Sequence, residues 1–293
     1  MNDYEGEDVI LVIVGIFAAV WMGRIFTCIS ALHAIKNLLV YADIIILGKI
    51  VPATNGERSM IYYDDLPLDE DILNALGELS INYVFQSIFQ ADGKTIYARE
   101  ALMRPTEMDV MELIDKYTKE DKLHVLEIAT FFGAMQEYQL RGYTEHICLN
   151  SFPSEWFTPA ETKAFADYYG DPKGLGIIEI LEYPYFSDFA CKMKLADTSG
   201  QNLLIAIDDF GAGVNDMNVV EKYSPQIVKL DRSLISGIDH IPEKQDNVRN
   251  LVLEFHSRGI LVVAEGVEEK EEFDYLVGLG VDLYQGYYLA RPA

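Results

Sequence analysis

The stretch LLIAIDD (203–209) decides the fold class, because a short run of apolar residues there ends in two acids. The same pattern returns in IVKLD (227–231), ILVVAE (260–265) and DLYQ (282–285). Apolar residues between these runs follow the spacing of amphipathic helices, most clearly in Lys270–Gly278. Short apolar strands that alternate with helices are typical of a parallel sheet in an α/β protein.

The same alternation extends outward from this stretch and predicts eight strands. They are Tyr83–Phe89, Thr95–Arg99, His146–Leu149, Gly176–Ile180, Leu203–Ile207, Ile227–Leu230, Ile260–Ala264 and Asp282–Gln285. The clearest predicted helices are Asp121–Leu140, Glu243–Arg258 and Lys270–Gly278. Eight strands with helices between them, over roughly 210 residues, fit a (β/α)8 barrel.

The connection between the first two strands departs from a regular barrel. Only QADGK (90–94) separates these strands, and so short a connection with an Asp-Gly turn joins antiparallel strands. We therefore expect an α/β fold: a modified (β/α)8, TIM-like barrel with an antiparallel first hairpin, preceded by an apolar N-terminal segment.

Composition excludes several classes of protein. The 293 residues include 47 acids and 23 basic residues, for a formal net charge of −24, and half of the residues are hydrophobic. Such a chain can bury a large core, but it does not offer the clustered Lys and Arg that a nucleic acid polymer needs. Its three cysteines, Cys28, Cys148 and Cys191, lack C-x-x-C spacing. They argue against a disulfide framework or zinc site and fit a reducing cytosol.

An apolar run, VILVIVGIFAAVWMGRIFTCI (9–29), precedes the barrel and carries Arg24 as its one charge. About 21 apolar residues are long enough to cross a bilayer as a helix. The alternative is a buried helix or pair of strands in a small N-terminal subdomain. A second apolar run (38–51) is shorter and could be an interfacial segment, a strand or half of a hairpin. Residues 1–51 are therefore a candidate membrane anchor.

The charges around this segment predict its orientation. Acids precede the run at Asp3, Glu5, Glu7 and Asp8, whereas Arg24, Lys36 and Lys49 lie at its end or beyond it. Because Lys and Arg favour the cytoplasmic side, we expect the barrel in the cytoplasm, anchored in the inner membrane. The polar, turn-rich residues 52–71 indicate a linker, and residues 72–293 form the barrel domain.

Polar side chains stand within the predicted strands or at their ends. They are Glu100, Asn150, Glu179, Asp208, Asp209, Lys229, Asp231, Glu265 and Gln285. A single carboxylate at a strand end is most often a helix cap or a turn residue. In a barrel, however, all these positions converge on the C-terminal face, where catalysis in this architecture is located. We therefore expect a catalytic site on that face.

The chemistry that this set implies is that of hard metal ions, because carboxylate and amide oxygens suit Mg2+ or Mn2+. Asp209 directly follows Asp208, so one carboxylate could bridge two ions while the next completes the second site. Two-metal phosphoester hydrolysis uses that arrangement. Lys229 could orient the attacking water or neutralise charge, and Glu265 could act as general base.

Five motifs together resemble one family. Glu100-Ala101-Leu102 with Met103-Arg104, IDDFGAG (207–213), VKLDRSLI (228–235), VVAEGVEE (262–269) and YQGYYLARP (284–292) occur in this order. The chain resembles the EAL-domain family over residues 83–292. The resemblance implies a modified (β/α)8 barrel with an antiparallel early strand, and the activity of a phosphodiesterase specific for cyclic di-GMP.

The resemblance also implies a role for each residue that matches the family's motifs. The metal ligands for two Mg2+ or Mn2+ ions fall on Glu100, Asn150, Glu179, Asp208 and Asp209. The catalytic lysine falls on Lys229 and the general base on Glu265. Glu268 matches a glutamate that supports the loop beside the metals. The substrate-binding residues are Arg104, Gln285 and Leu102.

Five places depart from the family's common pattern, one of them residues 106–122, which are abbreviated. Ser87 stands where a proline is frequent, Asn150 is followed directly by Ser151, and Leu181 replaces a frequent threonine. The loop after Gly213 reads VND (214–216) instead of Tyr-Ser-Ser. None of these changes removes a metal ligand, but the loop bears on the rate and its control.

The leading hypothesis is an enzyme of bacterial second-messenger signalling that hydrolyses cyclic di-GMP to linear pGpG. The alternative is a catalytically silent receptor that binds cyclic di-GMP and signals through its N-terminal region. A third hypothesis is a (β/α)8 hydrolase that acts on another phosphoester substrate. The family resemblance also suggests a homodimer through the barrel.

Overall fold

The computed structural model describes residues 68–169 and 175–293. The apolar runs at 9–29 and 38–51, and most of the predicted linker, lie outside the described residues. In the described part of the chain, no helix combines the length and the apolar character needed to cross a bilayer.

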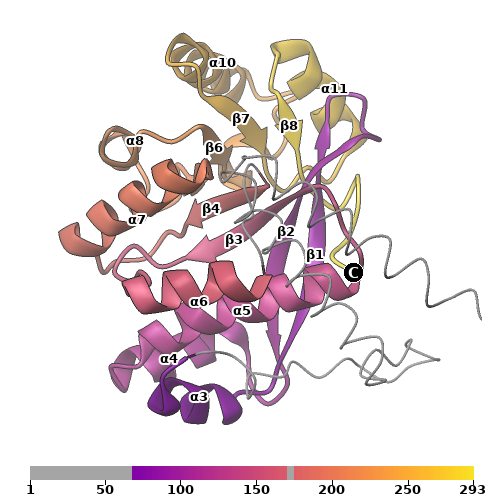
Figure 1. The fold of residues 1–293 in the computed structure, drawn as a ribbon. Coiled ribbons are helices and arrows are strands. Elements are labelled where there is room, and N and C mark those ends of the chain that lie inside the picture. Colours follow the sequence, from indigo (N-terminus) through magenta and orange to yellow (C-terminus); the bar gives the residue numbers. More distant parts are fainter. Residues whose placement is uncertain (1–67, 170–174) are drawn as a thin grey trace, which may run out of the picture. The chain divides into compact units, whose positions relative to one another are not determined.

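The described strands close into one barrel in the order β1 to β8 (Figure 1). They are β1 (Ile81–Gln90), β2 (Ile96–Pro105), β3 (His146–Ser151), β4 (Gly176–Ile180), β5 (Leu204–Phe210), β6 (Ile227–Leu230), β7 (Leu261–Ala264) and β8 (Leu283–Tyr284). β1 is antiparallel to both of its neighbours, β2 and β8, whereas all other neighbours are parallel. The modified barrel with its antiparallel first hairpin is therefore confirmed.

The turn between β1 and β2 shows why the first connection is a hairpin. The Asp92 carboxylate accepts hydrogen bonds from the backbone N–H groups of Lys94 (2.9 Å) and Thr95 (2.8 Å) and from the Thr95 hydroxyl (2.6 Å). Gly93 takes a left-handed conformation with φ 63°, which glycine adopts at little cost. Three hydrogen bonds to one side chain thus close the turn within the QADGK segment.

Four strands, β1, β2, β3 and β5, are longer than the sequence predicts, and the extensions of β2 and β5 matter most for the site. β2 was expected to end at Arg99, but it continues to Pro105 because the ladder to β1 runs without a break from Ala98 to Pro105. Glu100 therefore lies in the middle of β2 rather than at its end. β5 likewise continues through the acidic pair to Phe210. The apolar pattern missed these extensions because a strand whose partner supplies hydrogen bonds tolerates polar residues.

Helices cover the outside of the barrel. They are α3 (Glu70–Gly77), α4 (Val110–Lys119), α5 (Leu123–Leu140), α6 (Pro159–Tyr169), α7 (Asp188–Gln201), α8 (Met217–Tyr223), α9 (Arg232–Ile235), α10 (Pro242–Ser257) and α11 (Lys270–Leu279). The most buried of them is α5, and Figure 1 shows it beside α6. Phe131 of α5 packs edge-on against Phe157 and Phe165, and Phe132 packs edge-on against Phe165 and in a tilted arrangement against Phe157. This aromatic cluster joins the two helices to the barrel.

The C-terminal segment closes the barrel beside β1. The backbone of Ala293 exchanges two hydrogen bonds with Phe85, at 3.0 and 3.1 Å. Val267 donates its N–H to the Gln285 carbonyl (2.9 Å), and Tyr288 donates to the Val267 carbonyl (3.0 Å). Between these two bonds Gly286 lies directly against the Val267 backbone, so its lack of a side chain permits the approach.

We predict that Gly286→Ala destabilises the barrel. A Cβ at this position would lie 2.1 Å from the Val267 carbonyl oxygen and 2.3 Å from its nitrogen. Because neither backbone atom can swing away as a side chain does, the free energy of unfolding should fall by at least about 2 kcal/mol. Denaturant unfolding measures this change.

The matched control is Gly278→Ala, in the last turn of α11. No atom lies within 4 Å of a Cβ at that position, and alanine is the better helix former by about 0.5–1 kcal/mol. This variant should be as stable as the wild type or slightly more stable. Equal stability of the two alanine variants would contradict the steric argument.

Candidate active site

The site residues form one layer of the barrel interior, directly above an apolar layer. The apolar layer consists of Ile88, Ala98, Cys148, Ile177, Ala206, Ile227, Val263 and Leu283. Alternate residues of a strand share a face, so the residues two positions further on point the same way. Those residues are Glu100, Asn150, Glu179, Asp208, Lys229, Glu265 and Gln285. The period of the strands therefore brings together seven of the nine predicted residues, whereas the Asp231 carboxylate accepts the N–H of Ser233 as the N-cap of α9.

The first strand adds a residue to this layer. β1 runs in the opposite direction, so the matching position lies two residues before Ile88, at Gln86. Gln86 is paired with Glu100 across the hairpin, as Ile88 is with Ala98. Gln86 is not among the site residues expected from the sequence. The hairpin register is the signal that could have found it, since the QADGK turn (90–94) sets which residues face each other.

Lys229 lies at the centre of the polar layer. Its ammonium nitrogen is 2.7 Å from Asp208 Oδ1 and 2.8 Å from Glu265 Oε1. Glu179 Oε1 lies at 3.1 Å and Glu100 Oε2 at 3.3 Å. The Lys229 side chain is only 1% exposed. Four carboxylates from four strands thus converge on a single buried cation.

The protonation of Lys229 follows from this arrangement. Burial alone would lower the pKa of Lys229, but the carboxylates of Asp208 and Glu100 outweigh burial and hold the pKa well above its usual range. Burial raises the pKa of Glu265 well above its usual value and that of Glu179 to about 8, although Lys229 opposes both shifts. One ammonium therefore does not balance the four acids, and the site favours additional positive charge.

Glu100 is the best satisfied of these acids. It accepts a hydrogen bond from Gln285 Nε2 (2.6 Å) in addition to the lysine. Burial would raise the pKa of Glu100, but Lys229, Gln285 and Asn150 together outweigh it and hold the pKa below its usual value. Glu100 is therefore the carboxylate that most readily stays ionised in the barrel interior.

A kink in β5 brings both acids of the pair into the site. Consecutive strand residues normally point to opposite faces. Here Asp209 has a positive φ of 46°, and the ladder from β5 to β6 shifts between Ile207 and Phe210. As a result, carboxylate oxygens of Asp208, Asp209 and Glu265 all lie within 4.8 Å of one another. Burial and the neighbouring Asp208 raise the pKa of Asp209 to about 6.

Several buried oxygens of this layer accept no hydrogen bond. They are Asn150 Oδ1, Glu179 Oε2 and Gln285 Oε1, whereas Glu179 Oε1 is paired with the Lys229 ammonium at 3.1 Å. Buried polar atoms are rarely left without a partner. Unpartnered oxygens beside an excess of negative charge suit hard cations such as Mg2+ and Mn2+. The residues present therefore fit a metal centre in which side-chain oxygens would be the ligands.

The loop that follows β5 is held by two residues that the sequence analysis did not select. Glu182 Oε1 accepts the N–H of Val214 (3.0 Å). The Asn215 side chain is buried and donates to the carbonyls of Asp208 (2.5 Å) and Ile180 (3.4 Å). Asn215 thus joins the ends of β4 and β5 beside the acidic pair. Its place in the variant VND sequence is the signal that could have indicated it.

Glu268 makes a different contact from the one that the family resemblance implied. Its carboxylate pairs with Arg232 at 2.8 Å. Arg232 also donates to the Gly266 carbonyl, so this pair braces the segment that carries Glu265. The carboxylate contact with the loop after β5 comes instead from Glu182.

The three expected substrate-binding residues lie in different places. Gln285 is buried within the polar layer. Leu102 and Arg104 follow Glu100 at two-residue steps along β2, so they share its face of the strand. Arg104 is exposed, and its guanidinium donates to the Met103 carbonyl (2.7 Å). The structure therefore separates a buried polar layer from an exposed arginine nearer the end of β2.

Comparisons with known proteins identify the family of this chain. The EAL domain family model matches residues 69–292, and the chain therefore belongs to the EAL domain family. A cyclic di-GMP phosphodiesterase, TpdA, from Vibrio parahaemolyticus is 33% identical over 101 residues, which cover 34% of this chain and 17% of that protein. The chain thus spans about a sixth of that relative's length.

Two solved structures share the fold. A standalone EAL protein from Vibrio cholerae O395, bound to cyclic di-GMP, is 28% identical with a TM-score of 0.67, covering 74% of this chain and 93% of that chain. The manganese and cyclic di-GMP complex of BlrP1 from Klebsiella pneumoniae is 26% identical with a TM-score of 0.63, covering 73% and 56%. The expected family and the modified barrel are both confirmed.

We predict that Asn215→Asp destabilises the folded chain, because Asn215 connects the loop after β5 to β4 and β5. The substitution keeps the shape of the side chain, but it replaces the donor to two carbonyls with an oxygen that repels them. The free energy of unfolding should fall by about 1–3 kcal/mol, as denaturant unfolding would show. Asn247→Asp makes the same chemical change on an exposed position of α10 and should stay within about 0.5 kcal/mol. Similar losses in both variants would refute a specific role for Asn215.

Proposed function

We propose that this protein hydrolyses cyclic di-GMP to linear pGpG in bacterial second-messenger signalling. The observation that carries the proposal is the polar layer, in which Lys229 and four carboxylates lie beside buried oxygens without hydrogen-bond partners. The named relative TpdA and the ligands in the two related structures support cyclic di-GMP as the substrate.

The metal centre of this proposal holds two Mg2+ or Mn2+ ions. Their ligands would be Glu100, Asn150, Glu179, Asp208 and Asp209, all of which offer oxygen. Bound ions would supply positive charge to a phosphodiester and lower the pKa of a coordinated water. The excess of carboxylates over ammonium groups in the layer supports this assignment.

The chain's own residues then have distinct roles. Glu265, close to the acidic pair, acts as the general base that removes a proton from the attacking water. Lys229 holds Asp208, Glu265 and the other acids in place and neutralises charge on the phosphate oxygens. Exposed Arg104 binds a phosphate of the substrate through its guanidinium. Gln285 and Leu102 complete the substrate contacts.

We predict that Asp208→Asn abolishes turnover while the chain remains folded. A neutral amide would hold Mg2+ or Mn2+ more weakly than the carboxylate, so hydrolysis of cyclic di-GMP with either ion should fall by at least about a thousandfold. Chromatographic measurement of the linear product tests this. Asp274→Asn, on the exposed face of α11 where it pairs with Lys270, should keep wild-type activity. Substantial turnover by Asp208→Asn would sink the two-metal assignment.

The same assay separates the enzyme from the silent receptor. A receptor would bind cyclic di-GMP with metal present but would release no linear product. If the wild-type chain binds cyclic di-GMP without hydrolysing it, the receptor hypothesis is correct and the hydrolase proposal is wrong. All acids of the polar layer are present in this chain, which favours the enzyme.

Two further parts of the proposal concern association. We propose a homodimer through the barrel, supported by the exposed apolar side chains of Tyr185, Phe189 and Val214, which are 50–75% exposed.

We also propose that residues 9–29 attach the chain to the inner membrane and leave the barrel in the cytoplasm, where cyclic di-GMP is made and consumed. The length of the apolar run and the flanking charges support this attachment.

Fractionation of cells tests the attachment. The full chain should sediment with membranes and resist extraction by high salt, because burial of an apolar helix does not depend on ionic strength. A chain that begins near Leu66 should stay in the supernatant and keep its hydrolytic activity. A full chain that is soluble without detergent would show that residues 9–29 belong to a core and not to an anchor.

A further inference from the structure

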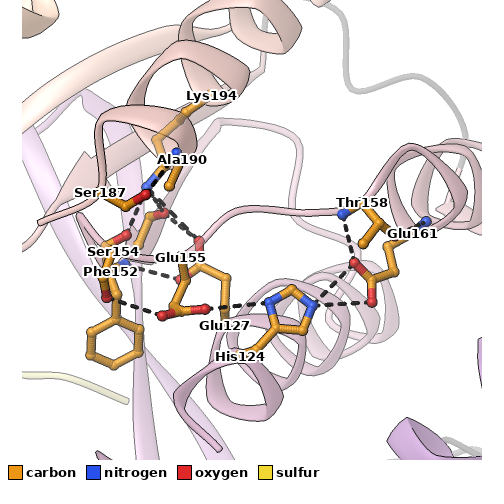
Figure 2. A network of polar contacts seen from close by, with 11 residues as sticks. His124, Glu127, Phe152, Ser154, Glu155, Thr158, Glu161, Ser187, Ala190 and Lys194 are labelled. Atoms are coloured by element: carbon orange, nitrogen blue, oxygen red, sulfur yellow. Dashed lines mark hydrogen bonds and ion pairs between the residues drawn. The ribbon is translucent and has the colours of Figure 1, made fainter. Parts of the chain in front are cut away.

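A second buried ion pair lies outside the cluster around Lys229 and joins two helices to the end of β3 (Figure 2). Glu127 comes from α5 and Lys194 from α7, and both side chains are completely buried. Their Oε1 and Nζ atoms are 4.0 Å apart. Both charged groups therefore reach across the core toward the same stretch of backbone.

That stretch is Ser151–Phe152. The Glu127 carboxylate accepts hydrogen bonds from the Ser151 hydroxyl (2.5 Å) and from the Phe152 N–H (2.9 Å). Lys194 donates to the Ser151 oxygen (2.6 Å) and to the Phe152 carbonyl (2.9 Å). The hydroxyl thus accepts from the lysine and donates to the glutamate. Phe152 is held through both its N–H and its carbonyl.

The clamped residues directly follow Asn150 in the chain. Asn150 is paired with Glu179 in the ladder between β3 and β4, and Ser151 is paired with Ile180. Leu181 also donates its N–H to the Ser151 carbonyl (3.1 Å). Fixing Ser151 therefore fixes the strand end from which the side chains of Asn150 and Glu179 enter the polar layer. Asn150 Oδ1 and Glu179 Oε2 are among the atoms that lack a hydrogen-bond partner there.

A purely structural role would not require charges here. Burial raises the pKa of Glu127 to about 7 and lowers that of Lys194 to about 8, which shows that the interior penalises both ionised forms. Well-packed apolar side chains often stabilise a core as much as a buried ion pair does. An ion pair with four directed hydrogen bonds differs from them in that it sets the position of the backbone.

We propose that Glu127 and Lys194 are positioning residues for the metal-binding amide of Asn150. This inference rests on the proposed function, because it assumes that Asn150 is a metal ligand. Neither residue touches the polar layer. Each acts through the Ser151–Phe152 backbone, which holds Asn150 and its neighbour Glu179 at the spacing that the ions require.

The test measures binding of Mn2+ alone to the full-length chain in mild detergent, by the electron paramagnetic resonance signal of the free ion. The variant Asp208→Asn defines the background binding to the acidic surface. The double variant Glu127→Gln/Lys194→Met removes both charges, so neither remains buried and unpaired. We expect its dissociation constant for Mn2+ to rise at least tenfold, with a cooperative thermal unfolding transition.

Ser151→Ala keeps the test decisive if the double variant does not fold. It removes only the shared hydroxyl and leaves almost no cavity, and we expect Mn2+ binding to weaken about threefold. The matched control is His124→Gln, one helical turn before Glu127 on α5. His124 contacts Glu155 (3.6 Å) and Glu161 (3.1 Å) in the outer part of the same network (Figure 2). This control should bind Mn2+ as the wild type does.

The outcomes are separable. Wild-type affinity in folded Ser151→Ala or in the folded double variant would overturn the positioning role and leave the proposed function intact. Equal weakening in His124→Gln would also overturn it, because any loosening of α5 would then suffice. Absence of Mn2+ binding above the Asp208→Asn background in the wild type would overturn the proposed function and, with it, this inference.

Discussion

The attraction between the Lys229 ammonium and the carboxylates around it is the interaction on which the site depends. Bulk water screens it little, because Lys229 and its partners lie inside a closed barrel. The single ammonium group lowers the electrostatic repulsion among the four nearby carboxylates, but it does not neutralise all of their charge. The remaining excess of negative charge favours further positive charge in the polar layer. Charge imbalance thus connects the stability of the fold to the chemistry of the site.

The architecture places this layer by a simple periodic rule. Every strand contributes an apolar residue to one interior layer, and the residue two positions away contributes to the next. Only the kink at Asp209 breaks the rule, and it does so where a second consecutive acid has to reach the same site. The strained conformation is supported from outside by Asn215 and Glu182, which tie the following loop to β4 and β5.

The periphery of the site is organised by buried polar groups rather than by loops alone. Glu127 and Lys194 hold the end of β3. Arg232 and Glu268 brace the segment that follows β7. Gly286, which has no side chain, lets the C-terminal segment pack against the backbone of Val267 in the segment after β7. Each of these contacts restrains backbone beside a residue of the polar layer. A metal centre needs such restraint, because its ligands must keep their spacing without the ions in place.

The sequence by itself determined the barrel, its antiparallel first hairpin and all residues of the polar layer except Gln86. These features follow from local patterns: short apolar runs, the Asp-Gly turn, and acids directly after apolar runs. Local patterns can be recognised in a single sequence. Only the tertiary structure decided how far β2 and β5 extend, that Gln86 joins the layer, and that Glu182 rather than Glu268 contacts the loop after β5. It also revealed that Glu127 and Lys194 meet at Ser151. These features depend on pairs of residues distant in the chain, and no local pattern encodes which distant partner a side chain will meet.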